Sequence, residues 1–186
     1  KACVPVTRAE VLFLIEASDF VGAANIELNK DFLKQSVAAL DVGPQVINVA
    51  IVAYGSSAQV VTPLLDNRDA LNTAIDSISV VGGDADLAAG LDQATSTLFD
   101  SVRNNAQPFI YLVASSQSTN SAQAITSADA AKSFGIIIVA QAVGSGALQD
   151  SQSVSSSDRQ VAQVENYSQL PQTGSSVSDR ICIVQN

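Results

Sequence analysis

The chain has 186 residues, of which 47% are hydrophobic and 15% charged, and its net charge is −9. This length fits one domain with a sizeable core, and the acidic balance disfavours nucleic acid and anionic membranes, since both need a basic surface. The sequence contains no His. Ser-His-Asp and Cys-His catalytic systems are therefore excluded, and the usual zinc ligand sets lose their commonest member.

Apolar residues follow strand and helix periodicities in alternation. Runs with strand character cover residues 10–16, 46–54, 59–64, 108–114, 136–143 and 160–164. Amphipathic stretches predict helices over about residues 25–42, 67–78, 87–99, 122–134 and 147–152, and a weaker helical segment follows Pro171. The short link 55–58 predicts a hairpin, so the strands on either side of it should be antiparallel.

Alternation of strands and helices is typical of a parallel sheet with helices on both faces. We therefore predict an α/β fold: a doubly wound, mostly parallel six-stranded sheet with one antiparallel edge strand. It should form a single domain over residues 1–186, with its core in 8–181. Asn25 and Asn67 are expected to cap their helices, and either Asp84 or Asp86 the next one.

Two cysteines, Cys3 and Cys182, lie near the two ends of the chain. Because domain termini often lie close together, a disulfide between them is expected, with two thiols as the alternative. A disulfide indicates an oxidising, extracellular compartment, and the N-glycosylation sequon at Asn166 agrees with that. The sequence has no signal peptide and no apolar run of the ~18 residues that a membrane span needs, so sequence outside this chain should direct secretion.

The end of the first strand reads Glu16-x-Ser18-x-Phe20, at the point where open α/β sheets hold ligands. It resembles the metal-ion-dependent adhesion motif of von Willebrand factor type A (vWA) domains, Asp-x-Ser-x-Ser. The element order, the hairpin, the Gly82-Gly83 loop and the flanking cysteines are also similar to that family, over essentially the whole chain. The Asp-Arg-Ile-Cys ending at residues 179–182 is most similar to modules of collagen VI, particularly the amino-terminal array of its alpha-3 chain.

In this family, three loops hold a divalent cation above the sheet, and a partner's carboxylate completes its coordination. The corresponding positions here are Glu16, Ser18, Phe20, Ala85 or Leu87, and Ser115. Ser18 is retained, and Glu16 keeps the carboxylate of the motif aspartate on a side chain that is one methylene longer. The second serine is replaced by Phe20, the threonine by Ala85 or Leu87, and the third-loop aspartate by Ser115. Because a hard dication needs several oxygen ligands, the resemblance implies a degenerate site with no functional metal and no cofactor.

Asp19, Asp84 and Asp86 are additional carboxylates on the same loops. Together with Glu16 they would form a different, more acidic site that suits Ca²⁺, which tolerates irregular geometry. The other interpretation is that Asp84 and Asp86 cap a helix while Asp19 is solvated.

The resemblance implies an extracellular-matrix structural or adhesion module, one domain of a larger secreted, collagen VI-like chain. Its partners would be matrix proteins or neighbouring vWA modules of the same chain, with no nucleic acid and no membrane insertion. The alternative is a cation-dependent adhesion domain that uses the remodelled acidic site. An enzyme is disfavoured, because the sequence has no phosphate loop and the Gly144-x-Gly146 pattern is only part of a dinucleotide fingerprint.

Overall fold

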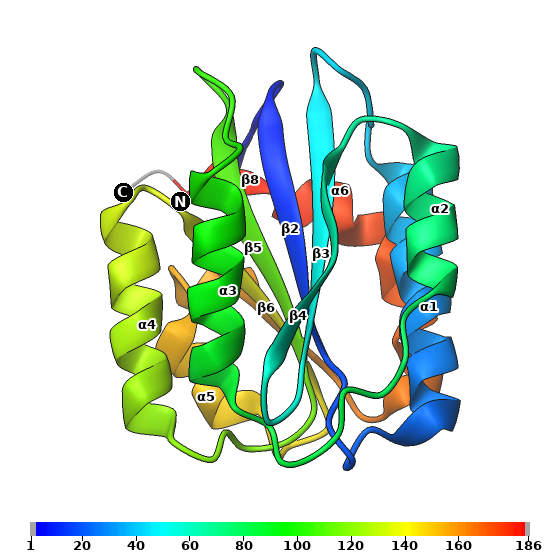
Figure 1. The fold of residues 1–186 in the computed structure, drawn as a ribbon. Helices are drawn as coiled ribbons and strands as arrows, with labels where there is room; N and C mark the ends of the chain where they lie inside the picture. Colours follow the sequence, from blue (N-terminus) through cyan, green and yellow to red (C-terminus); the bar gives the residue numbers. More distant parts are fainter. Residues whose placement is uncertain (1–2, 185–186) are drawn as a thin grey trace.

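The computed structural model describes residues 3–184 and is built around a six-stranded sheet of order β4-β3-β2-β5-β6-β7 (Figure 1). The strands are β2 (Ala9–Glu16), β3 (Ile47–Tyr54), β4 (Ala58–Leu65), β5 (Gln107–Ala114), β6 (Ile137–Val143) and β7 (Val161–Val164). All neighbouring pairs are parallel except β3–β4, so β4 is an antiparallel edge strand. The predicted fold class is confirmed.

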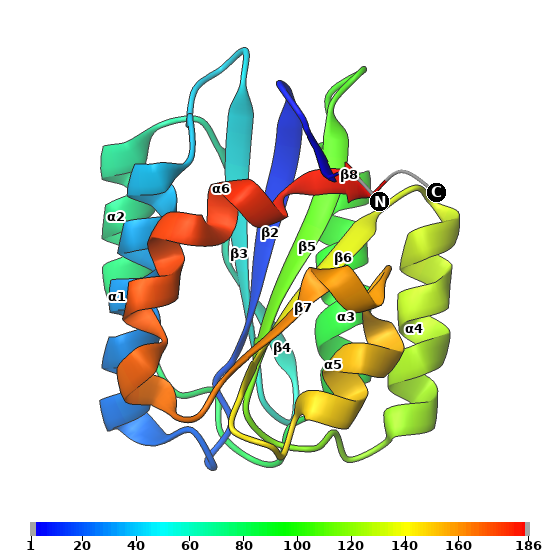
Figure 2. The same ribbon diagram turned by 180° about the vertical axis from the view of Figure 1, so that it is seen from behind.

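Helices cover both faces of the sheet. They are α1 (Gly22–Ala39), α2 (Arg68–Asp76), α3 (Leu87–Phe99), α4 (Ser121–Ser133), α5 (Leu148–Val154) and α6 (Val177–Arg180), with 3-10 turns η1 (Asp158–Gln160), η2 (Tyr167–Gln169) and η3 (Pro171–Ser176). Figure 1 shows α3, α4 and α5 on one face and α1 and α2 on the other. From behind, the segment from η3 to α6 lies along α1 (Figure 2). No helix in residues 3–184 is long and apolar enough to cross a membrane.

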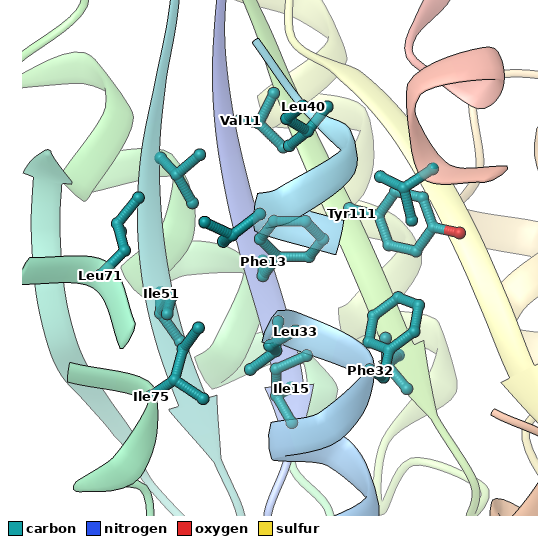
Figure 3. Close-up of a cluster of buried hydrophobic side chains, with 14 of the residues drawn as sticks. Val11, Phe13, Ile15, Phe32, Leu33, Leu40, Ile51, Leu71, Ile75 and Tyr111 are labelled. Carbon is teal, nitrogen blue, oxygen red and sulfur yellow. The ribbon is translucent and has the colours of Figure 1, made fainter. Parts of the chain in front are cut away.

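β2 is buried on both faces, as its unbroken apolar run predicts. Phe13 points into the layer beneath α1, where its ring meets Phe32 at 6.2 Å and Tyr111 at 5.5 Å between centroids (Figure 3). Leu12 and Leu14 point into the opposite layer, beneath α3 and α4. Because successive side chains of a strand face opposite ways, this one strand supplies both halves of the core.

Side-chain caps fix several helix starts. Asn67 accepts a hydrogen bond from Ala70 N, and Asp86, rather than Asp84, caps α3 by accepting one from Ala89 N at 3.0 Å. The prediction for Asn25 is wrong, because α1 begins three residues earlier, at Gly22. The left-handed φ of Gly22 turns the chain into the helix directly after the buried Val21, and the Asn25 amide instead donates to Val21 O from inside the first turn.

A second, two-stranded sheet joins the two ends of the described chain. β1 (Cys3–Pro5) pairs antiparallel with β8 (Cys182–Val184), an element that the sequence analysis did not predict. Cys182 is buried and disulfide-bonded. The side chain of Cys3 lies outside the described residues, so the Cys3–Cys182 bond stays a prediction.

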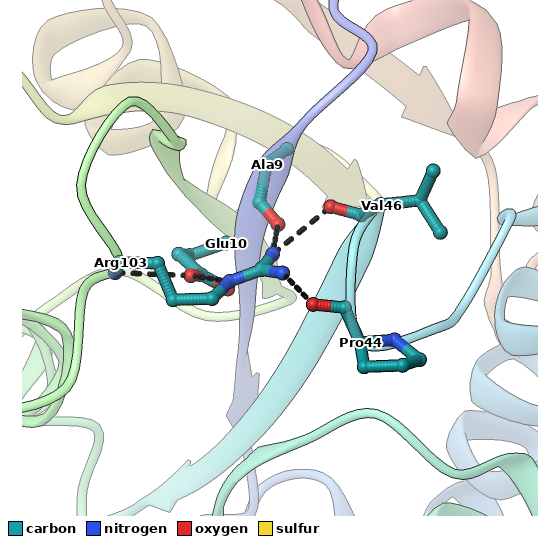
Figure 4. A network of polar contacts seen from close by, with 5 residues as sticks. All are labelled: Ala9, Glu10, Pro44, Val46 and Arg103. Carbon is teal, nitrogen blue, oxygen red and sulfur yellow. Dashed lines mark hydrogen bonds and ion pairs between the residues drawn. The ribbon is translucent and has the colours of Figure 1, made fainter.

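At the amino edge of the sheet, Arg103 binds the fully buried Glu10 at the start of β2. Its Nε donates to Glu10 Oε1 at 2.6 Å, and its Nη atoms donate to the carbonyls of Ala9, Pro44 and Val46 (Figure 4). One side chain therefore ties the entry of β2 to the entry of β3 and to the segment before β5.

Candidate functional site

The candidate site is the carboxyl edge of the sheet, the lower edge in Figure 1, where β2, β3 and β5 end in loops. Backbone hydrogen bonds join the loops after β2 and β3 to the loop between α2 and α3. Ala17 O accepts from Gly82 N at 3.1 Å, and Gly55 O accepts from Asp86 N at 2.8 Å. A Cβ at Gly55 would stand 2.2 Å from Gly82 O, so only glycine permits this approach.

Glu16 is fully buried at the end of β2 and accepts five hydrogen bonds. Ser18 Oγ donates at 2.8 Å from the loop that follows β2. From the loop that follows β5, Ser115 donates through its N at 2.6 Å and its Oγ at 3.1 Å. Ser116 donates through its N at 3.0 Å and also through its hydroxyl. Both carboxylate oxygens are thus satisfied by serine hydroxyls and backbone amides.

A buried tyrosine extends this network. Tyr167 Oη donates to Ser115 Oγ at 3.0 Å, which leaves the Ser115 hydroxyl proton for Glu16. Burial raises the pKa of Tyr167, and the charge of Glu16 raises it further, while the hydrogen bond with Ser115 acts in the opposite direction. The buried Asn29 amide lies close enough to lower that pKa slightly, but its geometry falls short of a hydrogen bond. Tyr167 therefore stays a neutral donor.

The remaining motif positions offer no oxygen ligand from their side chains. Phe20 is 72% exposed on the loop after β2, and Ala85 and Leu87 are buried in the core layer beneath α3. Ser18 Oγ and Ser115 Oγ donate their protons to Glu16 and keep only neutral lone pairs for a cation. Mg²⁺ is usually held through at least one carboxylate, and the only carboxylate at these positions, Glu16, already accepts five hydrogen bonds, so the residues do not fit a Mg²⁺ site.

The three additional aspartates do not join Glu16 in one site. Asp19 is exposed and accepts from Gly83 N at 3.0 Å, Asp86 is the cap of α3, and Asp84 is exposed. Within residues 3–184, no group of three or more His, Cys, Asp or Glu side chains is placed to hold a metal ion. The carboxylates that the sequence offers for a remodelled cation site thus have separate local roles.

A groove of about 720 Å³ opens beside this network. Its lining includes Phe20, Asn25, Leu28, Ser115, Glu165 and Tyr167. We call it the carboxyl-edge groove. Asn166 also lines it, exposed, with its Oδ1 accepting from Ser168 N at 3.1 Å.

Sequence reasoning missed two residues of this network, Ser116, which donates to Glu16, and Tyr167, which donates to Ser115. Ser116 is the immediate neighbour of the aligned Ser115, so a search one residue beyond the motif position would have found it. Tyr167 carries no such signal, because it reaches the network from a 3-10 turn fifty residues downstream.

Comparisons with known proteins agree with this architecture. Mouse vitrin is 31% identical over 103 residues, which cover 54% of this chain and 16% of vitrin. The mouse collagen alpha-4(VI) chain is 24% identical over 122 residues, 64% of this chain and 5% of that protein. This chain therefore spans only a small part of the length of these relatives.

Among solved structures, proximal thread matrix protein 1 from the mussel byssus superposes with a TM-score of 0.86 at 23% identity, over 97% of this chain and 48% of that one. At this identity the likeness shows the fold alone. The collagen VI chains among the relatives agree with the similarity noted in the sequence, and the assignment to the alpha-3 chain stays a prediction. The model of the von Willebrand factor type A domain matches residues 10–175, and the chain therefore belongs to the vWA family.

Proposed function

We propose that this chain is an extracellular-matrix module that makes protein–protein contacts as one domain, over residues 1–186, of a larger secreted chain. The observation that carries the proposal is the vWA match over residues 10–175 together with relatives that are collagen chains and vitrin. The small share of each relative that the chain covers fits one module among several. The disulfide at Cys182 fits an oxidising compartment.

The proposed contacts do not depend on a divalent cation. Phe20 and Ala85 offer no side-chain oxygen, and the Glu16 carboxylate already accepts five hydrogen bonds from Ser18, Ser115 and Ser116. Partners would be matrix proteins or neighbouring vWA modules. The proposal also includes a Cys3–Cys182 disulfide, glycosylation at the exposed Asn166, and the absence of enzymatic activity, for which the lack of His is the main support.

Calorimetric titration of the EDTA-treated protein with Mg²⁺, Mn²⁺ and Ca²⁺ tests the cation-independent part. We expect no binding heat up to millimolar cation. Binding that Glu16→Ala abolishes would overturn this part and favour the alternative, a cation-dependent adhesion domain. We test this alternative because a structure of proximal thread matrix protein 1 has zinc in its metal-ion-dependent adhesion motif.

Surface plasmon resonance against immobilised collagen VI, and against an immobilised second copy of the chain, tests the contact function. We expect binding to at least one surface, equal in EDTA and in Mg²⁺. Absence of binding to both surfaces contradicts the proposed contacts, and binding only in Mg²⁺ contradicts their cation independence.

A further inference from the structure

Within residues 3–184, Glu16 is a buried carboxylate with no Lys or Arg as an ion-pair partner. The ion pairs within residues 3–184 involve Glu27, Asp76, Glu10 and Asp129, and not Glu16. A buried charge is costly unless it is paired or fully hydrogen-bonded, and here five donors supply the compensation. Because five hydrogen-bond donors point at this one side chain, the site favours a negatively charged group at position 16.

The donors come from two separate loops, and the length of Glu16 decides which ones it reaches. In the β2–β5 register, Ile15 pairs with Val113, so Glu16 stands beside the last residue of β5. Its carboxylate lies further forward, among Ser18, Ser115 and Ser116. An aspartate is one methylene shorter and would fall short of the amides beyond the strand end.

We propose that the Glu16 carboxylate takes over the part that the cation plays in metal-binding members of the family, as the tie between the loops after β2 and β5. Where a cation gathers oxygen ligands from both loops, this anion gathers N–H and O–H donors from both. The residues do not fit the cation, because the oxygens of the carboxylate that replaces the motif aspartate already accept five hydrogen bonds, and Phe20 and Ala85 supply no side-chain oxygen.

This tie also positions the carboxyl-edge groove. Ser115 lines the groove, accepts a hydrogen bond from Tyr167 at 3.0 Å and donates to Glu16 at 3.1 Å. Glu16 is therefore a positioning residue for the groove, acting through Ser115 and Tyr167. It follows that the groove has the same shape with and without divalent cations. This inference goes beyond the proposed function, since it does not depend on which partner the chain binds.

Amide hydrogen exchange measured by NMR, resolved at Ser115 and Ser116, tests the tie. We expect both amides to be protected in the native protein, with rates unchanged between 1 mM EDTA and 10 mM MgCl₂. Glu16→Gln removes the charge, and Glu16→Asp keeps it but shortens the reach. Each should speed exchange at Ser115 and Ser116 about tenfold or more, as loss of a charge-assisted hydrogen bond predicts. Exchange in β6 should stay unchanged.

Glu165→Gln is the matched control, because Glu165 is an exposed carboxylate in the same groove that makes no hydrogen bond with Ser115 or Ser116. It should leave both rates as they are. If Glu16→Gln does not fold, Ser116→Ala, which deletes one hydroxyl donor at a half-buried position, should still speed exchange at Ser115. Native rates in Glu16→Asp or in Ser116→Ala, or slowing of exchange by Mg²⁺ in the native protein, would overturn the proposal. None of these outcomes depends on matrix binding, so the two proposals fail separately.

Discussion

Glu10 and Glu16 stand at the two ends of β2, both fully buried, and the protein satisfies them by different means. Glu10 is neutralised by the Arg103 guanidinium, whereas Glu16 is held by serine hydroxyls and backbone amides. An ion pair and an anion-binding loop differ in their response to substitution. Removing Arg103 leaves a buried charge without its counter-ion, whereas removing one serine hydroxyl loosens the loops around Glu16 but leaves its charge partly compensated by the other donors.

Arg103→Ala should lower the free energy of unfolding by about 3–5 kcal/mol, because breaking a buried ion pair strands its partner. Four carbonyl and carboxylate groups around it would also lose a donor. Urea denaturation followed by circular dichroism measures the change. Lys132→Ala, which breaks the i,i+3 pair with the exposed Asp129, is the control and should cost about 0.5 kcal/mol or less. A cost below about 1 kcal/mol for Arg103→Ala would contradict the importance of this pair.

At the scale of the elements, the two candidate caps of α3 make a matched pair. Asp86→Ala should cost about 1 kcal/mol, because it removes the acceptor for Ala89 N. Asp84→Ala changes an exposed residue two positions earlier and should stay within about 0.5 kcal/mol of the native protein. Thermal unfolding of both variants distinguishes them, and an equal effect at the two positions would argue against the cap.

Sequence periodicity was sufficient to predict the four inner strands β2, β3, β5 and β6, because strands buried on both faces are continuous apolar runs that need no knowledge of their neighbours. The half-exposed edge strand β4 was predicted to be antiparallel from the short hairpin link before it. Periodicity failed where tertiary contacts decide. α1 starts early, at the left-handed turn of Gly22 that follows the buried Val21, and β1 and β8 are three-residue strands that pair with each other. For the site, the motif positions could be aligned from the sequence. The hydrogen bond from Ser116 to Glu16 depends on the register of β2 and β5, and the hydrogen bond from Tyr167 to Ser115 depends on the packing of η2, and neither can be read from the sequence.

At the scale of the whole molecule, all three tyrosines of the chain are buried, Tyr111 and Tyr167 in one core layer and Tyr54 in the other. Burial raises the pKa of each, and the charge of Glu16 adds to the effect at Tyr54 and Tyr167. At Tyr111, Arg180 opposes the effect of burial without cancelling it. At alkaline pH, the tyrosine side chains of the folded protein therefore stay protonated while those of the unfolded chain lose their protons.

Alkaline pH should consequently destabilise the protein. Stability from these groups is complete below pH 10, the ordinary tyrosine pKa, and is lost as the pH rises above it. Each tyrosine contributes a slope of at most about 1.4 kcal/mol per pH unit, so all three together contribute at most about 4 kcal/mol per pH unit. Urea denaturation between pH 8 and 11.5 measures the slope, and Tyr167→Phe should reduce it by about a third. Tyrosinate absorbance that rises near pH 10 while the protein stays folded would contradict this.

The pairing of β1 with β8 has a mechanical consequence. Cys3 stands opposite Val184 and Pro5 opposite Cys182. Tension on the two chain ends therefore separates β1 from β8 and breaks the hydrogen bonds between them one after another. In optical tweezers we expect this opening at low force. With the proposed Cys3–Cys182 bond intact, the load should then pass through the covalent link and bypass the six-stranded sheet, so the long extension of an unfolding core should appear only under reducing conditions. With that bond in place, tension on the two ends would leave the carboxyl-edge groove, at the opposite edge of the sheet, free of load.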